Sequence, residues 1–183
     1  MNAIDPNEQG ALQAVATAEQ LRRQFTQAMR GFASAVAVIT VAHGGQRSGY
    51  TATSVSSFCA EPPTVLVSTK ETSSSAALIT GSGRFAVNLL APRHKAVAQR
   101  FTGFGGETGE QRYAGADWLQ LSPGGAPVLR DSVVALDCSV DEVMARHGHL
   151  LLFGRVRAIH APQPEQPPLL YWQGAYQSME ALL

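Results

Sequence analysis

The chain has 183 residues, a formal net charge of zero and only 15% charged residues. This length is typical of one domain with a flexible end, and the balanced charge argues against a nucleic-acid surface. The two cysteines are far apart and lack CxxC spacing, so we expect a reducing cytoplasm and no disulfide. The N-terminal residues lack the basic and apolar segments of a signal peptide, and no apolar run approaches the ~18 residues of a membrane span.

The first predicted element in chain order is a helix. Residues 1–16 are polar and alanine-rich without a clear period, so we expect a flexible N-terminal arm before a domain over 17–183. Thr17 and Gln20 form a capping-box pair. Four apolar residues then recur at helical spacing and predict a helix down to about residue 32: Leu21, Phe25, Met29 and Phe32.

Strands dominate the rest of the chain. Short apolar or alternating segments predict strands over 35–41, 64–69, 84–90, 134–140 and 149–160. Two short helices are predicted between them, one over 76–80 ended by Gly81 and one that begins at Pro92 and ends at Gly103. The remaining segments are interpreted as an irregular loop over 102–125, a linker over 162–168 and a last strand or ordered turn over 169–176. Six or seven strands with peripheral helices predict a mainly β fold, an antiparallel barrel.

One segment of the chain is unusually rich in hydroxyl side chains. Residues 51–57 contain five serines and threonines, and residues 61–63 close the segment as Glu-Pro-Pro. Hydroxyls and free backbone amides suit a phosphorylated ligand with many hydrogen-bond acceptors. The alternative is an ordinary polar loop.

Sequence motifs for common catalytic machinery are missing. Residues 103–109 look like a dinucleotide-binding loop, but Thr108 stands where the third glycine is required and the preceding segment reads as helix. His147 and His149 lack a carboxylate or cysteine cluster that would complete a metal site. We therefore predict neither a catalytic side chain nor a metal: the protein is no enzyme, or a cofactor carries its chemistry.

Four pieces of the sequence, in order, resemble one family. The first, 25–40, is similar to its opening helix and strand, with Ala35 in place of a common glycine. The second, 49–63, follows GxTxSSxxSxSxxPP, with mild departures at Thr53 and Val55. The third and fourth are 84–90, close to RFxVNxL, and the closing strands, where 149–156 and 170–176 resemble GDHxxFxGxV and LxYxxGxY. On these residues the chain resembles the short-chain flavin reductases of the FMN-binding split-barrel group.

The resemblance implies an antiparallel split β-barrel and an NAD(P)H:flavin oxidoreductase. Such a protein transfers hydride from NADH or NADPH to FMN or FAD, forms a homodimer, and supplies reduced flavin to a flavin-dependent monooxygenase, without nucleic acid or membrane. Here His147-Gly148-His149 replaces the common Gly-Asp-His, so the choice between NADH and NADPH stays open. Two alternatives also stay open: a flavin-binding protein without turnover, and a bound-flavin oxidase resembling pyridoxamine-phosphate oxidases.

The same resemblance assigns candidate site residues. His149 and Tyr176 are expected on the nicotinamide side, and Trp172 at the dimer interface. Structural roles compete with these assignments: a helix cap for residues 73–75, an exposed face residue for Arg100, and backbone hydrogen bonds for Asn88. The residues expected to bind the flavin are Tyr50, Thr51, Ala52, Thr53, Ser54, Ser56, Ser57, Thr72, Ser73, Ser75, Asn88 and Arg100.

Overall fold

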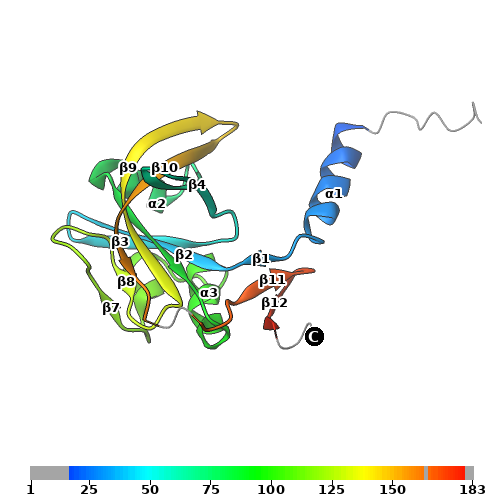
Figure 1. Cartoon of the computed structure of the whole chain (residues 1–183). Helices are drawn as coiled ribbons and strands as arrows, with labels where there is room; N and C mark the ends of the chain where they lie inside the picture. The colour runs from blue at the N-terminus through cyan, green and yellow to red at the C-terminus, as the bar shows by residue number, and fades with distance from the viewer. Residues whose placement is uncertain (1–16, 163–164, 180–183) are drawn as a thin grey trace, which may run out of the picture. The chain divides into compact units, whose positions relative to one another are not determined.

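The computed structural model describes residues 17–162 and 165–179 (Figure 1). The chain divides into two compact units, Met1–Phe32 and Ala33–Leu183, and each is described by itself. The predicted arm over 1–16 and residues 163–164 of the predicted linker lie outside the described residues. Within the described ranges, no helix is long and apolar enough to cross a membrane.

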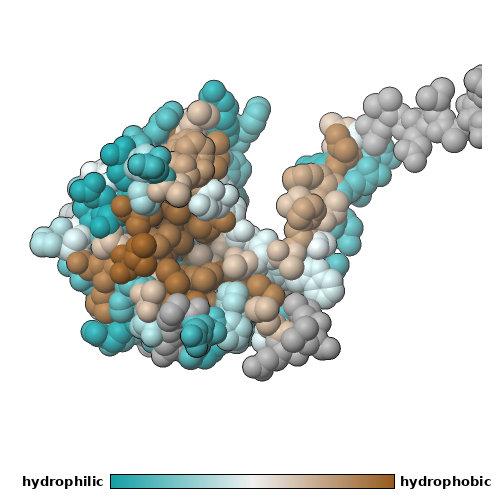
Figure 2. Space-filling view, viewed as in Figure 1, coloured by the Kyte–Doolittle hydropathy of each residue, from teal (hydrophilic) through white to brown (hydrophobic). Residues whose placement is uncertain are grey.

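The helix of the first unit, α1 (Ala18–Met29), begins as its sequence predicts. The Thr17 hydroxyl accepts a hydrogen bond from the Gln20 backbone N–H at 3.2 Å, and the Gln20 side chain accepts one from the Thr17 N–H at 2.8 Å. The helix ends at Met29, three residues earlier than predicted. Its apolar stripe is not covered: the exposed fractions of Leu21 and Phe25 are 60% and 64% (Figure 2).

The second unit is built on one seven-stranded antiparallel sheet, as predicted. Its strands are β2 (Ala37–His43), β3 (Gln46–Ala52), β4 (Ser56–Ala60), β5 (Pro63–Lys70), β6 (Arg84–Leu89), β9 (Val134–Arg146) and β10 (His149–His160). They pair in the order β3-β2-β6-β9-β10-β5-β4, so β3 and β4 form opposite edges although only three residues join them. Six strand spacings would cover ~29 Å in a flat sheet, whereas four Cα steps reach at most ~15 Å. The sheet must therefore curl into a barrel.

Apolar side chains on one face of the sheet fill the barrel. Along β2, Ile39 and Val41 point inward with Phe85 of β6, while Val38 points outward. Helix α2 (Ser74–Ser82) adds Ile79 to the interior. This helix continues past the predicted stop at Gly81, because the left-handed residue that ends it is Gly83, with a φ of 64°.

A second helix covers the outer face of β2 and β3. The short helix η2 (Pro92–His94) leads into α3 (Lys95–Thr102), which ends at Gly103 as predicted. Phe101 of α3 is buried against Val38. It sits close to β3 because Gly49 has no side chain: a Cβ there would lie 2.6 Å from the Phe101 ring.

The predicted irregular loop over 102–125 contains regular structure, so that interpretation was wrong from residue 109 onward. A 3₁₀ helix, η3 (Gly109–Tyr113), is followed by β7 (Trp118–Leu119), which pairs with β8 (Val128–Leu129). The rings of Tyr113 and Trp118 lie 4.9 Å apart and both contact Phe101. These aromatic contacts hold the segment against α3.

The chain closes with a small separate sheet. Strand β1 (Ser34–Ala35) pairs with β11 (Leu170–Trp172), and β11 pairs with β12 (Ala175–Gln177). Gln173 and Gly174 form the turn of this hairpin with φ angles of 52° and 82°, which a two-residue hairpin turn requires at both positions. The tail predicted as a strand or a turn contains both.

Candidate cofactor site

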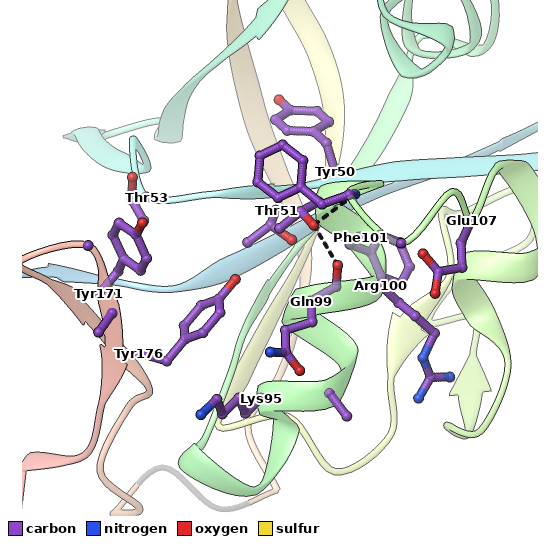
Figure 3. A pocket seen from close by; sticks show the side chains of 16 residues that line it. Tyr50, Thr51, Thr53, Lys95, Gln99, Arg100, Phe101, Glu107, Tyr171 and Tyr176 are labelled. Carbon is purple, nitrogen blue, oxygen red and sulfur yellow. Dashed lines mark hydrogen bonds between the residues drawn. The ribbon is translucent and has the colours of Figure 1, made fainter. Parts of the chain in front are cut away.

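A cavity of about 1110 Å³ lies between four segments of the second unit. The walls are the end of β3, one face of α3, the loop after α3, and the β11–β12 hairpin (Figure 3). Segments up to 126 residues apart in sequence therefore meet at one place, from Tyr50 to Tyr176.

Five of the sequence-predicted residues line this cavity: Tyr50, Thr51, Thr53, Arg100 and Tyr176. The Thr51 hydroxyl donates to the Ala98 carbonyl at 2.6 Å, which fixes β3 against α3 and leaves the hydroxyl lone pairs free to accept. The exposed Thr53 hydroxyl makes no hydrogen bond within the described ranges. Burial raises the pKa of the Tyr50 phenol, so this group stays protonated at neutral pH.

The face of α3 that lines the cavity carries two cations. Lys95, Ala96, Gln99 and Arg100 lie on the same side of the helix, since residues three and four positions apart are neighbours there. Their backbone groups take part in the helix, but neither the Lys95 ammonium nor the Arg100 guanidinium has an ion pair or a hydrogen bond with a described residue. Sequence reasoning missed Lys95 and Gln99: they lie five and one positions from Arg100, and this spacing alone does not place them on its face of the helix.

The β11–β12 hairpin supplies an aromatic wall. Tyr171 and Tyr176 pack edge to face with ring centroids 5.4 Å apart. Burial, and then the neighbouring Tyr171, raise the pKa of Tyr176, so its phenol is neutral and can donate a hydrogen bond. Tyr171 was not predicted. It lies opposite Tyr176 because β11 and β12 pair, and this pairing is not visible in the sequence alone.

The loop after α3 is held at both ends. The Thr102 hydroxyl donates to the Gln99 carbonyl at 2.6 Å and accepts from the Phe104 N–H at 3.2 Å, as the dashed lines in Figure 3 show. The Arg112 guanidinium donates to the Glu107 carbonyl at 3.1 Å and to the Gly49 carbonyl on β3. One carboxylate oxygen of Glu107 is buried without a partner among the described residues, beside the cavity.

The rest of the hydroxyl-rich segment lies elsewhere. The structure breaks it at 53–55, so it forms the end of β3 and the start of β4 instead of one strand. Ala52 is buried on β3, and the Ser54 hydroxyl bonds to Ser68 at 3.1 Å. Ser56 and Ser57 are exposed on the edge strand β4 and do not line the cavity.

Three of the predicted residues make hydrogen bonds that hold the fold together. Ser73 caps α2, accepting from the Ala76 N–H at 3.1 Å. The buried Ser75 bonds to the Ser48 hydroxyl at 3.0 Å. The fully buried Asn88 donates to the Val38 carbonyl and to Thr40 and accepts from the Leu129 N–H. These bonds occupy the side chains, so we do not carry the three residues into the site proposed below.

His149 and Thr72 lie together, away from the cavity. His149 is exposed at the tip of the β9–β10 hairpin, opposite Lys70, with its Nδ1 3.2 Å from the His147 carbonyl. The Glu71 N–H donates to the Gly148 carbonyl at 3.0 Å, which ties this tip to the turn that contains the exposed Thr72. Neither at this hairpin tip nor around the cavity do the described residues include three His, Cys, Asp or Glu side chains that could hold a metal.

The geometry favours a flat, anionic ligand. Aromatic rings form one wall, a helix face with two unpaired cations forms another, and hydroxyls lie between them. Cations without internal partners suit phosphate groups, and aromatic rings suit a planar ring system. The cavity volume lies slightly above the range usual for small-molecule sites and is large enough for a dinucleotide-sized cofactor.

Comparison with known proteins agrees with this geometry. Residues 29–180 match the family described as flavin reductase like domain. The chain is 35% identical over 158 residues to the flavin-dependent monooxygenase reductase subunit HsaB of Rhodococcus jostii, covering 86% of this chain and 78% of the relative. It is 37% identical over 156 residues to the FMN reductase (NADH) RutF of Methylorubrum extorquens, covering 85% and 74%. The crystal structure of nitrilotriacetate monooxygenase component B from Mycobacterium thermoresistibile superposes with a TM-score of 0.79 at 32% identity, covering 90% of each chain. The chain belongs to the flavin reductase like domain family.

Proposed function

We propose that this protein is an NAD(P)H-dependent flavin reductase that holds FMN or FAD in the cavity between β3, α3 and the β11–β12 hairpin. The observation that carries the proposal is the pair of unpaired cations, Lys95 and Arg100, on the helix face that lines this cavity. Family membership supports the flavin, and the relatives named above supply the precedent for NADH.

The residues of the cavity fit such a cofactor. Tyr171 and Tyr176 offer apolar ring surface for a planar ring system. Thr51 and Thr53 offer hydroxyls for a polyol chain or for ring carbonyls. Lys95 and Arg100 are placed to neutralise a phosphate.

A bound flavin supplies the chemistry of accepting hydride from a nicotinamide. The chain's own part is to hold the rings in contact and to exclude water. The described residues that line the cavity include neither a histidine nor a cysteine. The neutral Tyr176 phenol is a fixed hydrogen-bond donor toward whichever ring lies beside it.

For the nicotinamide we keep two candidates. Tyr176 lines the cavity, whereas His149 lies on the exposed hairpin tip. If His149 contacts the nucleotide, His149→Ala lowers the rate with NADH while the dissociation constant for FMN stays the same. A change in FMN affinity alone would refute that role.

We infer that the protein forms a homodimer and works with a flavin-dependent monooxygenase in the cytoplasm. The exposed apolar stripe of α1 and the apolar surface on the barrel unit in Figure 2 support a dimer, with Trp172 as a candidate interface residue. The names of the relatives, reductase subunits of monooxygenases, support the partner. The free Cys59 and Cys138 suit a reducing compartment.

The decisive experiment is anaerobic reduction of FMN and FAD by NADH and by NADPH, followed at the absorbance band of oxidised flavin. We expect many equivalents of flavin to be bleached per protein. Tight binding without bleaching would refute the reductase and favour a storage protein. Flavin that copurifies and turns over with oxygen and an amine substrate would favour the oxidase alternative.

A further inference from the structure

Phe104 is the most exposed large apolar side chain in the described part of the chain. Its exposed fraction is 96%, against 65% for Phe32, the next highest. The ring lies at the rim of the cavity that the proposed function assigns to the flavin. An uncovered phenyl ring contributes little to the packing of the fold, and its place at the edge of the cavity leaves it available to a ligand that enters there.

The backbone on both sides of Phe104 forms a glycine-rich turn that fixes the position from which its side chain extends. Gly103 and Gly106 take φ angles of 74° and 89°, which a side chain at either position would disfavour. A Cβ at Gly105 would lie 2.8 Å from a carboxylate oxygen of Glu107. A hydrogen bond from the Gly106 N–H to the Gly103 carbonyl at 3.1 Å closes this glycine turn, and the hydrogen bond from the Phe104 N–H to Thr102 anchors it on α3.

Opposite this rim stand the tyrosines of the β11–β12 hairpin. Figure 3 shows Tyr171 and Tyr176 entering from the hairpin side, while α3 and the loop after it form the other side. A planar ligand between the two sides can be contacted by aromatic rings from both. The two tyrosines pack on each other, whereas the Phe104 ring has no aromatic partner among the described residues.

We propose that Phe104 stacks on the ring system of the bound flavin and so sets the affinity of the site for the tricyclic ring. This inference rests on the proposed function. Because riboflavin, FMN and FAD share that ring, the contact contributes equally to all three. It is thereby distinct from the phosphate contacts of Lys95 and Arg100, which riboflavin cannot use.

The test measures binding of riboflavin, FMN and FAD to the purified full-length protein by equilibrium titration, without NADH. The variants are Phe104→Ala, Phe104→Leu and Phe104→Trp, and the control is Ile159→Ala. Ile159 is another exposed apolar side chain, at 64%, and it lies outside the cavity. Since Phe104 is almost fully exposed, its truncation removes no core packing, and circular dichroism verifies that each variant is folded.

We expect Phe104→Ala to raise all three dissociation constants by about 3- to 10-fold, the range of an aromatic pair contact. Phe104→Leu should lose most of this affinity, Phe104→Trp should retain it, and Ile159→Ala should change nothing. Unchanged constants for Phe104→Ala, or a loss confined to FAD, would overturn the proposal. Failure of the wild-type protein to bind any flavin would instead overturn the proposed function.

Discussion

Gly154, in the middle of β10, is the position where one added methyl group tests the packing of the barrel. It faces Phe85 of β6 across the barrel interior. A Cβ at residue 154 would lie 2.8 Å from Cε1 of Phe85, nearer still to Cζ, and 3.2 Å from Cβ of Cys138. Gly154→Ala is therefore expected to destabilise the fold although it leaves every hydrogen bond of the sheet in place.

The size of the effect follows from the space available. Ordinary contact begins at 3.4 Å, so the Phe85 ring must retreat by more than 0.6 Å, the difference between 3.4 and 2.8 Å. Phe85 is 0% exposed and has no free volume to retreat into. Overpacking of this kind costs about 1–3 kcal/mol, and replacing glycine in a strand recovers about 0.5–1 kcal/mol. We expect a net loss of about 1.5 kcal/mol, or a fall in Tm of roughly 3–6 °C.

The assay is a double-mutant cycle measured by urea unfolding. Gly154→Ala, Phe85→Leu and the double variant are compared with the wild type at one protein concentration, because dimerisation would make stability concentration-dependent. Leucine vacates the space that the new methyl group needs, so the double variant should be more stable, by about 1 kcal/mol, than the sum of the single changes predicts. Strictly additive losses would refute the steric explanation.

Other predictions address the site, the acid response and the assembly. Arg100→Ala should raise the FMN dissociation constant about 10-fold and leave that of riboflavin unchanged, with the exposed Arg157→Ala as control; equal losses for both ligands would contradict a phosphate contact. Burial is the largest single effect on Asp131 and raises its pKa, but the hydrogen bonds and charges of His94 and Arg93 together outweigh it, so the pKa lies below its ordinary value of 3.8. The stabilisation from the Asp131 carboxylate is therefore present above pH 3.8 and is lost as the pH falls through the lowered pKa. Asp131→Asn should remove this acid-sensitive part of the stability, at most about 1 kcal/mol because the carboxylate is half exposed. An unchanged pH profile of the urea midpoint would count against this role of Asp131. Phe25→Ser on α1 should shift sedimentation from dimer toward monomer if the apolar stripe forms the interface, and a dimer of unchanged affinity would exclude that role.

Local sequence signals were enough for most of the fold. The capping box at Thr17 and the glycine that ends α3 act within a few residues, so they could be predicted without knowing what packs nearby. The alternation along the first half of β9 likewise reflects one face turned toward the barrel interior.

Contacts between distant segments explain where the predictions failed. The stop of α2 at Gly81 was wrong, because either glycine could end the helix locally and only Gly83 takes the left-handed conformation. The segment after residue 109 is ordered by the contacts of Tyr113 and Trp118 with Phe101, which no local pattern reveals.

The candidate site likewise has a part that the sequence predicts and a part that only the tertiary contacts decide. The sequence by itself determined the family, the barrel class and a small set of polar residues for the flavin, since these follow from residue types at fixed spacing. Only the tertiary structure decided which of them share a cavity: it brought Thr51, Arg100 and Tyr176 together with the unpredicted Lys95 and Phe104, and it left His149 on a hairpin tip. The physical reason is that a curled sheet joins strand ends from opposite edges, so neighbours in space are set by how the barrel closes and by which helix covers it.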